Sequence, residues 1–102
     1  METKFSIIIP AFNEEKYIEE TLKSIPKNKE TEIIVICNSC TDNTKKIAKK
    51  YAEVISIKEK NVSRARNIGA RKSKGCILIF LDADTLLTKN SLKEIEKTLK
   101  HG

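Results

Sequence analysis

Two aspartates separated by one residue, Asp82 and Asp84, are the residues of this chain best suited to chemistry. They follow the apolar run Cys76–Leu81, which predicts a buried strand. Two carboxylates at the end of such a strand raise each other's pKa unless a positive charge opposes them. Hard cations such as Mg²⁺ and Mn²⁺ bind carboxylates together with substrate phosphates. The pattern therefore indicates a metal-assisted site for a phosphorylated ligand, although an acidic turn has the same sequence.

Alternating strands and helices are predicted along the rest of the chain. Strands are expected where β-branched and apolar residues run together, and helices where apolar residues recur at helical spacing. The expected strands are Lys4–Pro10, Glu32–Cys37, Glu53–Ile57 and Cys76–Leu81, and the expected helices are Glu14–Ile25, about Asp42–Tyr51, about Val62–Ser73 and about Ser91–Lys100. This order predicts one α/β domain over residues 1–102, with a three-layer parallel sheet and helices on both faces.

Local signals indicate how the first helices begin and where one strand lies. Asn13 is expected to cap the first helix, and Thr41 or Asp42 the second. Tyr17 falls on the apolar side of the first helix and is expected to face the core. The strand Glu53–Ile57 is shorter and more polar than the others, which places it near an edge of the sheet.

The bulk composition limits the partners. A net charge of +6 favours anionic partners such as nucleotides, phospholipid headgroups or nucleic acid, although most lysines fall on the solvated faces of expected helices. Aromatic residues are few and the lysines are spread over several helices, so no nucleic-acid partner is expected. The sequence has neither a secretory signal nor a run long enough to span a membrane. We therefore expect a cytoplasmic protein, with peripheral contact to a membrane surface left open.

The three cysteines, Cys37, Cys40 and Cys76, are an odd number in a chain without a secretory signal, which argues against disulfide bonds. A zinc site at Cys37-x-x-Cys40 would need further ligands, and Cys76 and His101 are the remaining candidates. We interpret Cys37 as a small buried residue at the end of a strand and Cys40 as a turn residue.

Chemically informative segments follow three of the expected strands, and another lies in the third helix. They are Pro10–Glu14, Asn38–Thr44, Arg64–Ala70 and Asp82–Asp84. In a parallel sheet, the segments that follow the strands share one edge and can converge on one ligand.

The order of these segments resembles the nucleotide-binding half of inverting family-2 glycosyltransferases with the GT-A fold. The matching segments are Ile7–Glu15 (IIIPAFNEE), Cys37–Thr44 (CNSCTDNT), Ala65–Gly69 (ARNIG) and Leu78–Leu92 (LIFLDADTLLTKNSL). The resemblance covers almost the whole chain and implies a truncated GT-A fold, which is Rossmann-like. It also implies a glycosyltransferase-type domain that binds a nucleotide-diphosphate sugar through Mg²⁺ or Mn²⁺ on the Asp-x-Asp motif, for sugar transfer to an acceptor.

The resemblance also implies roles for single residues. The segment Pro10–Glu14 would lie against the nucleoside, and Arg66 near the base or the diphosphate. Asp82 would face the ribose or the sugar and share the cation with Asp84, which would bind it where it bridges the diphosphate. The donor-binding residues implied in this way are Pro10, Ala11, Phe12, Glu14, Asn38, Arg66, Asp82 and Ala83, and the metal ligands are Asp84 and Asp82.

Two departures from the family pattern leave alternatives open. Cys37-Asn38 replaces the usual pair of aspartates, so the base of the donor is undetermined. Family members continue with a second half that supplies the acceptor site and the general base, and no catalytic residue is identified in this chain. The alternatives are a nucleotide-sugar-binding module that needs a partner chain for activity, and a flavodoxin-like or receiver-like domain that uses paired acids for Mg²⁺. A half-fold would also expose a sheet edge or an apolar patch, which predicts a homo-oligomer.

Overall fold

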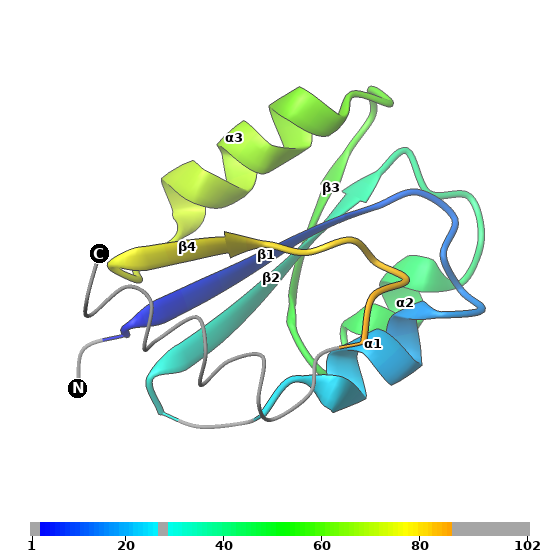
Figure 1. The fold of residues 1–102 in the computed structure, drawn as a ribbon. Coiled ribbons are helices and arrows are strands. Elements are labelled where there is room, and N and C mark those ends of the chain that lie inside the picture. Colours follow the sequence, from blue (N-terminus) through cyan, green and yellow to red (C-terminus); the bar gives the residue numbers. More distant parts are fainter. Residues whose placement is uncertain (1–2, 27–28, 87–102) are drawn as a thin grey trace.

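The structure, a computed structural model, describes residues 3–26 and 29–86 and is a parallel sheet with helices on both faces (Figure 1). The elements in chain order are β1 (Phe5–Ala11), α1 (Ile18–Ser24), β2 (Thr31–Asn38), α2 (Thr44–Ala48), β3 (Glu53–Ile57), α3 (Val62–Lys72) and β4 (Ile77–Phe80). All strand pairs are parallel and the strand order is β3-β2-β1-β4. The predicted alternation of strands and helices is confirmed, while the helix predicted over Ser91–Lys100 lies outside the described residues.

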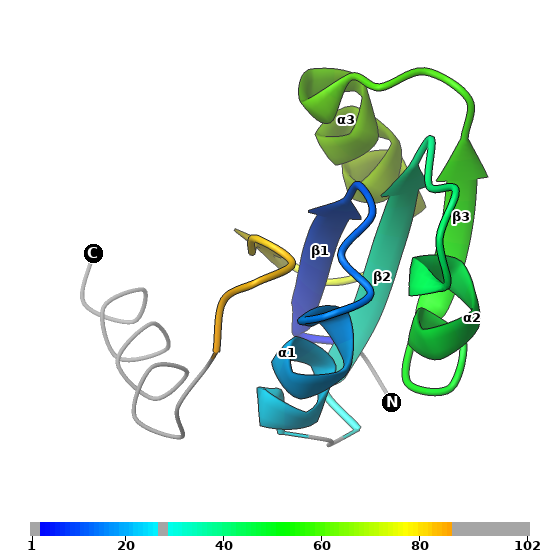
Figure 2. The same ribbon diagram turned by 90° about the vertical axis from the view of Figure 1, so that its right-hand side faces the viewer.

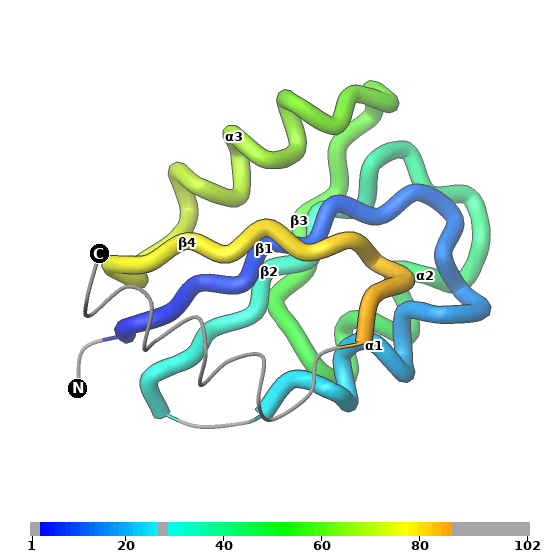
Figure 3. The backbone as a smooth tube through the Cα atoms, in the orientation of Figure 1, coloured from blue at the N-terminus to red at the C-terminus, as the bar shows by residue number. Residues whose placement is uncertain are grey.

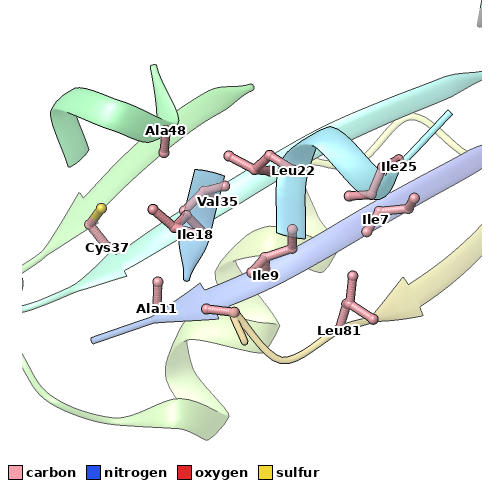
Figure 4. Packing of buried hydrophobic residues seen from close by; sticks show 11 residues of the cluster. Ile7, Ile9, Ala11, Ile18, Leu22, Ile25, Val35, Cys37, Ala48 and Leu81 are labelled. Atoms are coloured by element: carbon pink, nitrogen blue, oxygen red, sulfur yellow. The ribbon is translucent and has the colours of Figure 1, made fainter. Parts of the chain in front are cut away.

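The central strand β1 supplies core residues to both faces of the sheet. Helices α1 and α2 lie on one face and α3 lies on the other (Figure 2). Ile7 and Ile9 belong to the cluster that includes Leu22 of α1, which the close-up in Figure 4 shows, whereas Ile8 packs in the cluster of Ala65 of α3. Both faces of β1 are apolar because both are covered, as is usual for the inner strands of parallel sheets.

Helix α3 approaches β1 closely at Gly69. A Cβ atom at this position would lie 2.4 Å from Cγ2 of Ile8, which no real contact allows. The absence of a side chain at Gly69 therefore sets the distance between the helix and the sheet. This close packing holds the start of α3 beside the carboxyl ends of the strands.

The strand β4 differs from its prediction. It lies at an edge of the sheet and exposes Leu78 and Phe80, whose side chains are 39% and 46% exposed. Phe80 pairs with Ile8, but α3 packs against β1 and β2 rather than against β4. The prediction of a buried strand is wrong because an apolar run does not show which of its faces is covered. The predicted edge position of Glu53–Ile57 is confirmed.

The first helix begins later than predicted. Its N-cap is Tyr17, without a side-chain cap, and Tyr17 is 52% exposed rather than in the core. Asn13 instead has φ 49°, and its Oδ1 accepts a hydrogen bond from the N–H of Thr41 at 2.8 Å. The predicted cap is wrong because Asn13 joins the turn after β1 to the turn after β2.

The second helix is shorter than predicted and begins at Thr44 after Asn43. Thr41 does not cap it, since its hydroxyl accepts from the Asn13 amide at 3.2 Å. The carboxylate of Asp42 accepts from the N–H of Thr44 at 2.9 Å and also from the Thr44 hydroxyl. Asp42 therefore stabilises the start of α2 from two residues before it.

Candidate functional site

A cavity of about 300 Å³ lies at the carboxyl edge of the sheet. Its walls bring together eight of the nine residues to which the sequence assigned a donor or metal role, and they add Val62. The lining residues are Pro10, Ala11, Phe12, Glu14, Asn38, Val62, Asp82, Ala83 and Asp84. The ninth predicted residue, Arg66, lies on α3 one turn beyond Val62 and is not part of the wall. The roles assigned to these residues remain predictions.

The cavity opens where β1 and β4 separate. These strands pair only as far as Ile8 and Phe80, whereas β1 continues to Ala11 beside β2. Pro10 has no N–H to donate and lies beyond the β4 pairing, which suits its position. The chain places β2 and β3 on one side of β1 and β4 on the other, and ligands bind where the strand order switches sides in open α/β sheets. Figure 3 shows the segments after β1, β2 and β4 running toward the same end of the sheet.

Three hydrogen bonds fix the backbone at and next to the segment Asp82–Asp84. The N–H of Leu81 donates to Ile8 O at 3.0 Å, and the N–H of Thr85 donates to Asp82 O at 3.0 Å. The buried hydroxyl of Thr21 in α1 donates to Ala83 O at 2.6 Å. Ala83 is therefore turned into the core, and the aspartates on either side of it are exposed.

Glu14 adds a third carboxylate to the cavity wall. Its pKa is raised by partial burial and by the negative charges of Asp84, Asp42 and Asp82. Its backbone N–H donates to the hydroxyl of Thr44 at 2.8 Å, which ties it to the start of α2. Together with Asp82 and Asp84, Glu14 gives the cavity wall an acidic lining.

The donor set suits a cation held jointly by protein and ligand. Among the described residues, no three Asp, Glu, His or Cys side chains form a complete metal site. The cavity nevertheless exposes Asp82 and Asp84, which are separated by one residue, and Glu14 lines the same wall. Mg²⁺ is commonly bound by one or two carboxylates, with substrate phosphates and waters as the other ligands. The residues present therefore fit a divalent cation that arrives with a phosphorylated ligand.

Asn38 connects the cavity to α3. It is 2% exposed, and its Oδ1 accepts from the N–H of Asn61 at 2.9 Å. Asn61 caps α3, because its own Oδ1 accepts from the N–H of Arg64 at 3.0 Å. With its oxygen engaged, Asn38 has its NH₂ group, a donor, to offer a ligand in the cavity.

The cysteine pair lies beside a different cavity. This cavity, of about 280 Å³, is lined by residues that include Cys37, Cys40 and Lys58. Cys37 is buried at the end of β2, which confirms its interpretation as a small core residue. Burial, together with Cys40, raises the pKa of Cys37 to about 12. A thiol with this pKa stays protonated at neutral pH, which disfavours thiolate chemistry at this position.

Two residues near the site were not identified from the sequence. Val62 lines the cavity, and the ammonium of Lys60 lies 4.0 Å from the ring centroid of Phe12 in its wall. Both lie where the loop after β3 meets α3, and the sequence pattern predicts only that a helix begins there. Their proximity to Phe12 depends on the path of this loop, and no local motif signals it.

Comparisons with known proteins show to which family the chain belongs. The profile of the family described as Glycosyl transferase family 2 matches residues 6–102. The chain belongs to glycosyltransferase family 2. It is 32% identical over 102 residues to the poly(ribitol-phosphate) beta-N-acetylglucosaminyltransferase TarS of Staphylococcus aureus, a match that covers 89% of this chain and 18% of TarS.

Solved structures of other proteins have the same fold. The crystal structure of S. aureus TarS 1–349 in complex with UDP-GlcNAc gives a TM-score of 0.86 at 31% identity, over 97% of this chain and 32% of that one. Glucosyl-3-phosphoglycerate synthase from Mycobacterium tuberculosis, in complex with Mn²⁺, UDP and glucosyl-3-phosphoglycerate, gives a TM-score of 0.68 at 29% identity, over 79% of this chain and 33% of that one. The predicted GT-A fold is therefore confirmed.

This family-2 chain corresponds to the N-terminal region of the GT-A fold and spans about a fifth of the length of TarS. Its relatives are crystallised with nucleotides, a nucleotide sugar and Mn²⁺, the ligands that the sequence analysis predicted for the class. Among the described residues, no helix has the length and apolar character that crossing a bilayer requires.

Proposed function

We propose that the cavity of this family-2 glycosyltransferase chain binds a nucleoside-diphosphate sugar together with Mg²⁺ or Mn²⁺. The observation that carries the proposal is the composition of the wall. A proline, an aromatic ring and an amide lie in the same cavity as Glu14, Asp82 and Asp84. The apolar residues suit a nucleoside, and the carboxylates suit a cation that neutralises a diphosphate.

Asp84 is assigned to the cation and Asp82 to the cation and the ribose or sugar. The hydrogen bond from Thr21 to Ala83 supports this assignment, because it keeps Ala83 inward and both aspartates accessible. A divalent cation bound there would stabilise the negative charge that develops on a departing nucleoside diphosphate. Asp82 and Asp84 would hold that charge-compensating ion at the edge of the sheet where the diphosphate enters.

The nucleoside is assigned to the segment Pro10–Glu14 and to Asn38. Phe12 offers a partly exposed ring for stacking, and Asn38 offers an NH₂ donor to a base carbonyl. A uracil carbonyl is a suitable acceptor, and TarS, which shares the fold at a TM-score of 0.86, is crystallised with UDP-GlcNAc. We therefore propose a UDP-sugar as the donor. Arg66, one turn along α3 from the cavity, is assigned to the diphosphate.

The reaction proposed for the whole protein is transfer of the sugar to an acceptor with inversion. The described residues account for the donor side of that reaction. The general base that deprotonates the acceptor is assigned to residues outside 3–86, because the three cavity carboxylates are committed to the cation and the donor.

Calorimetric titration with UDP-GlcNAc, GDP-mannose and a CDP-sugar, each with Mn²⁺, Mg²⁺ or EDTA, tests the proposal. We expect metal-dependent binding of the uridine nucleotide and a loss of about 100-fold in Asp84→Asn, of the order found when a charged ligand loses its partner. Glu53→Gln, which removes an exposed charge at the opposite edge of the sheet, is the matched control and should bind like the wild type. Equal binding with EDTA, or equal affinity of Asp84→Asn and wild type, would overturn the metal assignment.

A further inference from the structure

The cavity proposed to bind the sugar donor has a negatively charged wall without a compensating positive residue among those that the structure describes. Its lining residues include three carboxylates, Glu14, Asp82 and Asp84, and, within the described chain, no lysine or arginine. A nucleoside diphosphate brings further negative charge to this surface. A divalent cation offsets only part of that total, so a positive group near the wall, in addition to Arg66 on α3, would strengthen binding.

Lys60 places a positive group beside this wall. Its Nζ lies 4.0 Å from the ring centroid of Phe12, within the range of a cation–π contact. Phe12 lines the cavity and is 37% exposed, so the ammonium is held beside the cavity by a residue of the cavity wall.

The backbone that carries Lys60 is fixed to the site. The next residue, Asn61, donates its N–H to Asn38 of the cavity wall at 2.9 Å, and its side chain caps α3. Val62, which follows, lines the cavity itself. Lys60 therefore lies on a short segment joined to the donor site by two consecutive residues.

The charge of Lys60 is not used within the described part of the chain. The neighbouring acid, Glu59, pairs with Arg64 at 3.4 Å, and no ion pair to Lys60 is formed among residues 3–26 and 29–86. A contact with the face of an aromatic ring leaves most of an ammonium's donor capacity available. Lys60 can therefore bind an anion without first breaking a salt bridge.

We propose that Lys60 is a further donor-binding residue, which uses Phe12 as its support and binds the phosphate groups of the nucleotide at the rim of the cavity. This inference rests on the proposed donor site and adds a residue to it. A lysine at the rim would add a positive charge to those of the cation at Asp84 and of Arg66 around the diphosphate. The lysine would thereby offset the repulsion from the three carboxylates.

The test compares two lysines of the same loop. Lys60→Gln and Lys58→Gln remove the same charge two residues apart, but Lys58 lines the other cavity, beside Cys37. UDP affinity with Mn²⁺ is measured for both by calorimetry over a range of salt concentrations. We expect Lys60→Gln to weaken UDP binding about 5- to 10-fold and to flatten its salt dependence, and Lys58→Gln to change it less than about 2-fold.

Two further measurements separate a phosphate contact from an effect through Phe12. Lys60→Arg, which keeps the charge, should restore UDP affinity to within about 2-fold of wild type. Binding of uridine, which has no phosphate, is followed by NMR shifts and should be the same in Lys60→Gln and wild type. Equal weakening of uridine and UDP, or tighter UDP binding in Lys60→Gln, would overturn the proposal.

The outcomes also distinguish this inference from the proposed function. If the wild type binds UDP and Asp84→Asn does not, but the two lysine variants behave alike, only the role of Lys60 fails. If the wild type binds no nucleotide with Mn²⁺ or Mg²⁺, the donor site fails and the role of Lys60 fails with it. Circular dichroism of each variant establishes that the comparison is between folded proteins, as expected for an exposed side chain.

Discussion

The two ends of the sheet differ in whether a glutamate carboxylate is hydrogen-bonded by the surrounding protein. At the amino end, Glu32 of β2 accepts hydrogen bonds from the hydroxyl of Ser6, at 2.6 Å, and from the backbone N–H of Lys74. At the carboxyl end, the carboxylate of Glu14 accepts no hydrogen bond from the described residues, and its pKa is raised by burial and by Asp84. A carboxylate that the fold itself satisfies serves the structure, whereas one left among like charges is available to a ligand.

The amino end is closed by a small network. The hydroxyl of Ser6 donates to Glu32 and accepts from the N–H of Gly75 at 2.8 Å, which joins β1, β2 and the turn before β4. A Cβ atom at Gly75 would lie 2.8 Å from the backbone of Phe5, so the turn packs directly on β1. The polar groups of this network bond to one another, so substitutions in it should change stability without changing ligand affinity.

The largest effect is expected for Glu32→Ala. The substitution leaves the buried hydroxyl of Ser6 and the N–H of Lys74 without their acceptor, and we expect a loss of about 2–3 kcal/mol in the free energy of unfolding. Urea unfolding measures it, and the affinity of the folded fraction for UDP should not change. Glu53→Ala, which removes an exposed glutamate from the same end of the sheet, should unfold within about 0.5 kcal/mol of wild type. Comparable losses in the two variants would show that the network does not stabilise the fold.

At the carboxyl end, Thr21→Val should affect stability and affinity together. It removes the hydroxyl that donates to Ala83 O and leaves that carbonyl buried without its donor, which costs about 1–2 kcal/mol. Because the segment Asp82–Asp84 is then less firmly held, we expect metal-dependent UDP affinity to fall about 3- to 10-fold. The matched control is Ser24→Ala in the same helix, whose hydroxyl donates to Thr21 O. It should lower stability alone, and a loss of affinity in Ser24→Ala would mean that α1 acts on the site only through its general stability.

The strands and the location of the site could be predicted from the sequence. The strands follow from runs of β-branched residues, and the bounds predicted for Glu53–Ile57 match β3. Eight site residues that the family resemblance implied line one cavity, and their convergence is expected because parallel strands end at a common edge. The sheet and the neighbourhood of the site could therefore be predicted without any knowledge of side-chain contacts.

The predictions that failed concern contacts between distant segments. Asn13 has the residue type and position of a helix cap, but it adopts a positive φ and bonds to Thr41, 28 residues later. The run that forms β4 has the composition of a buried strand, yet Phe80 is 46% exposed because of its place in the strand order. Lys60 meets Phe12 only through the path of the loop before α3. Each of these features depends on tertiary structure, which local patterns do not specify.

A smaller effect, with opposite signs for stability and binding, is expected for Glu14→Gln. A raised folded-state pKa means that ionised Glu14 disfavours the fold at pH 7 relative to its neutral form. The substitution should therefore raise the Tm at pH 7 by about 1–3 °C while weakening Mn²⁺-dependent UDP binding about 5-fold. The gain in Tm should disappear below the unfolded-state pKa of about 4.5, where wild-type Glu14 is protonated in both states. A lower Tm at pH 7 would show that Glu14 stabilises the fold as Glu32 does.

The smallest effect, with the reverse dependence on pH, is expected for Asp42→Asn. Burial alone would raise the pKa of Asp42, but hydrogen bonds from Thr44 outweigh it and hold the pKa below its usual range. Ionised Asp42 therefore stabilises the fold above its unfolded-state pKa of about 3.8, and this contribution is lost as the pH falls through the lower folded-state value. Because Asn keeps an acceptor for Thr44, we expect a Tm about 1 °C below wild type at pH 7 and a vanishing difference in acid.

Thermal melts of Glu14→Gln and Asp42→Asn at pH 7 and in acid would test how local the contrast between the two carboxylates is. Glu14 and Asp42 share Thr44, whose hydroxyl accepts from the Glu14 N–H and donates to Asp42. One carboxylate is nevertheless satisfied by the fold and the other is not, although a single threonine separates them. Opposite shifts in Tm for the two variants would show that the division between structural and ligand-binding carboxylates holds within the carboxyl end itself. Shifts of the same sign would mean that the acids around Thr44 titrate as one cluster, and the contrast would then apply only between the two ends of the sheet.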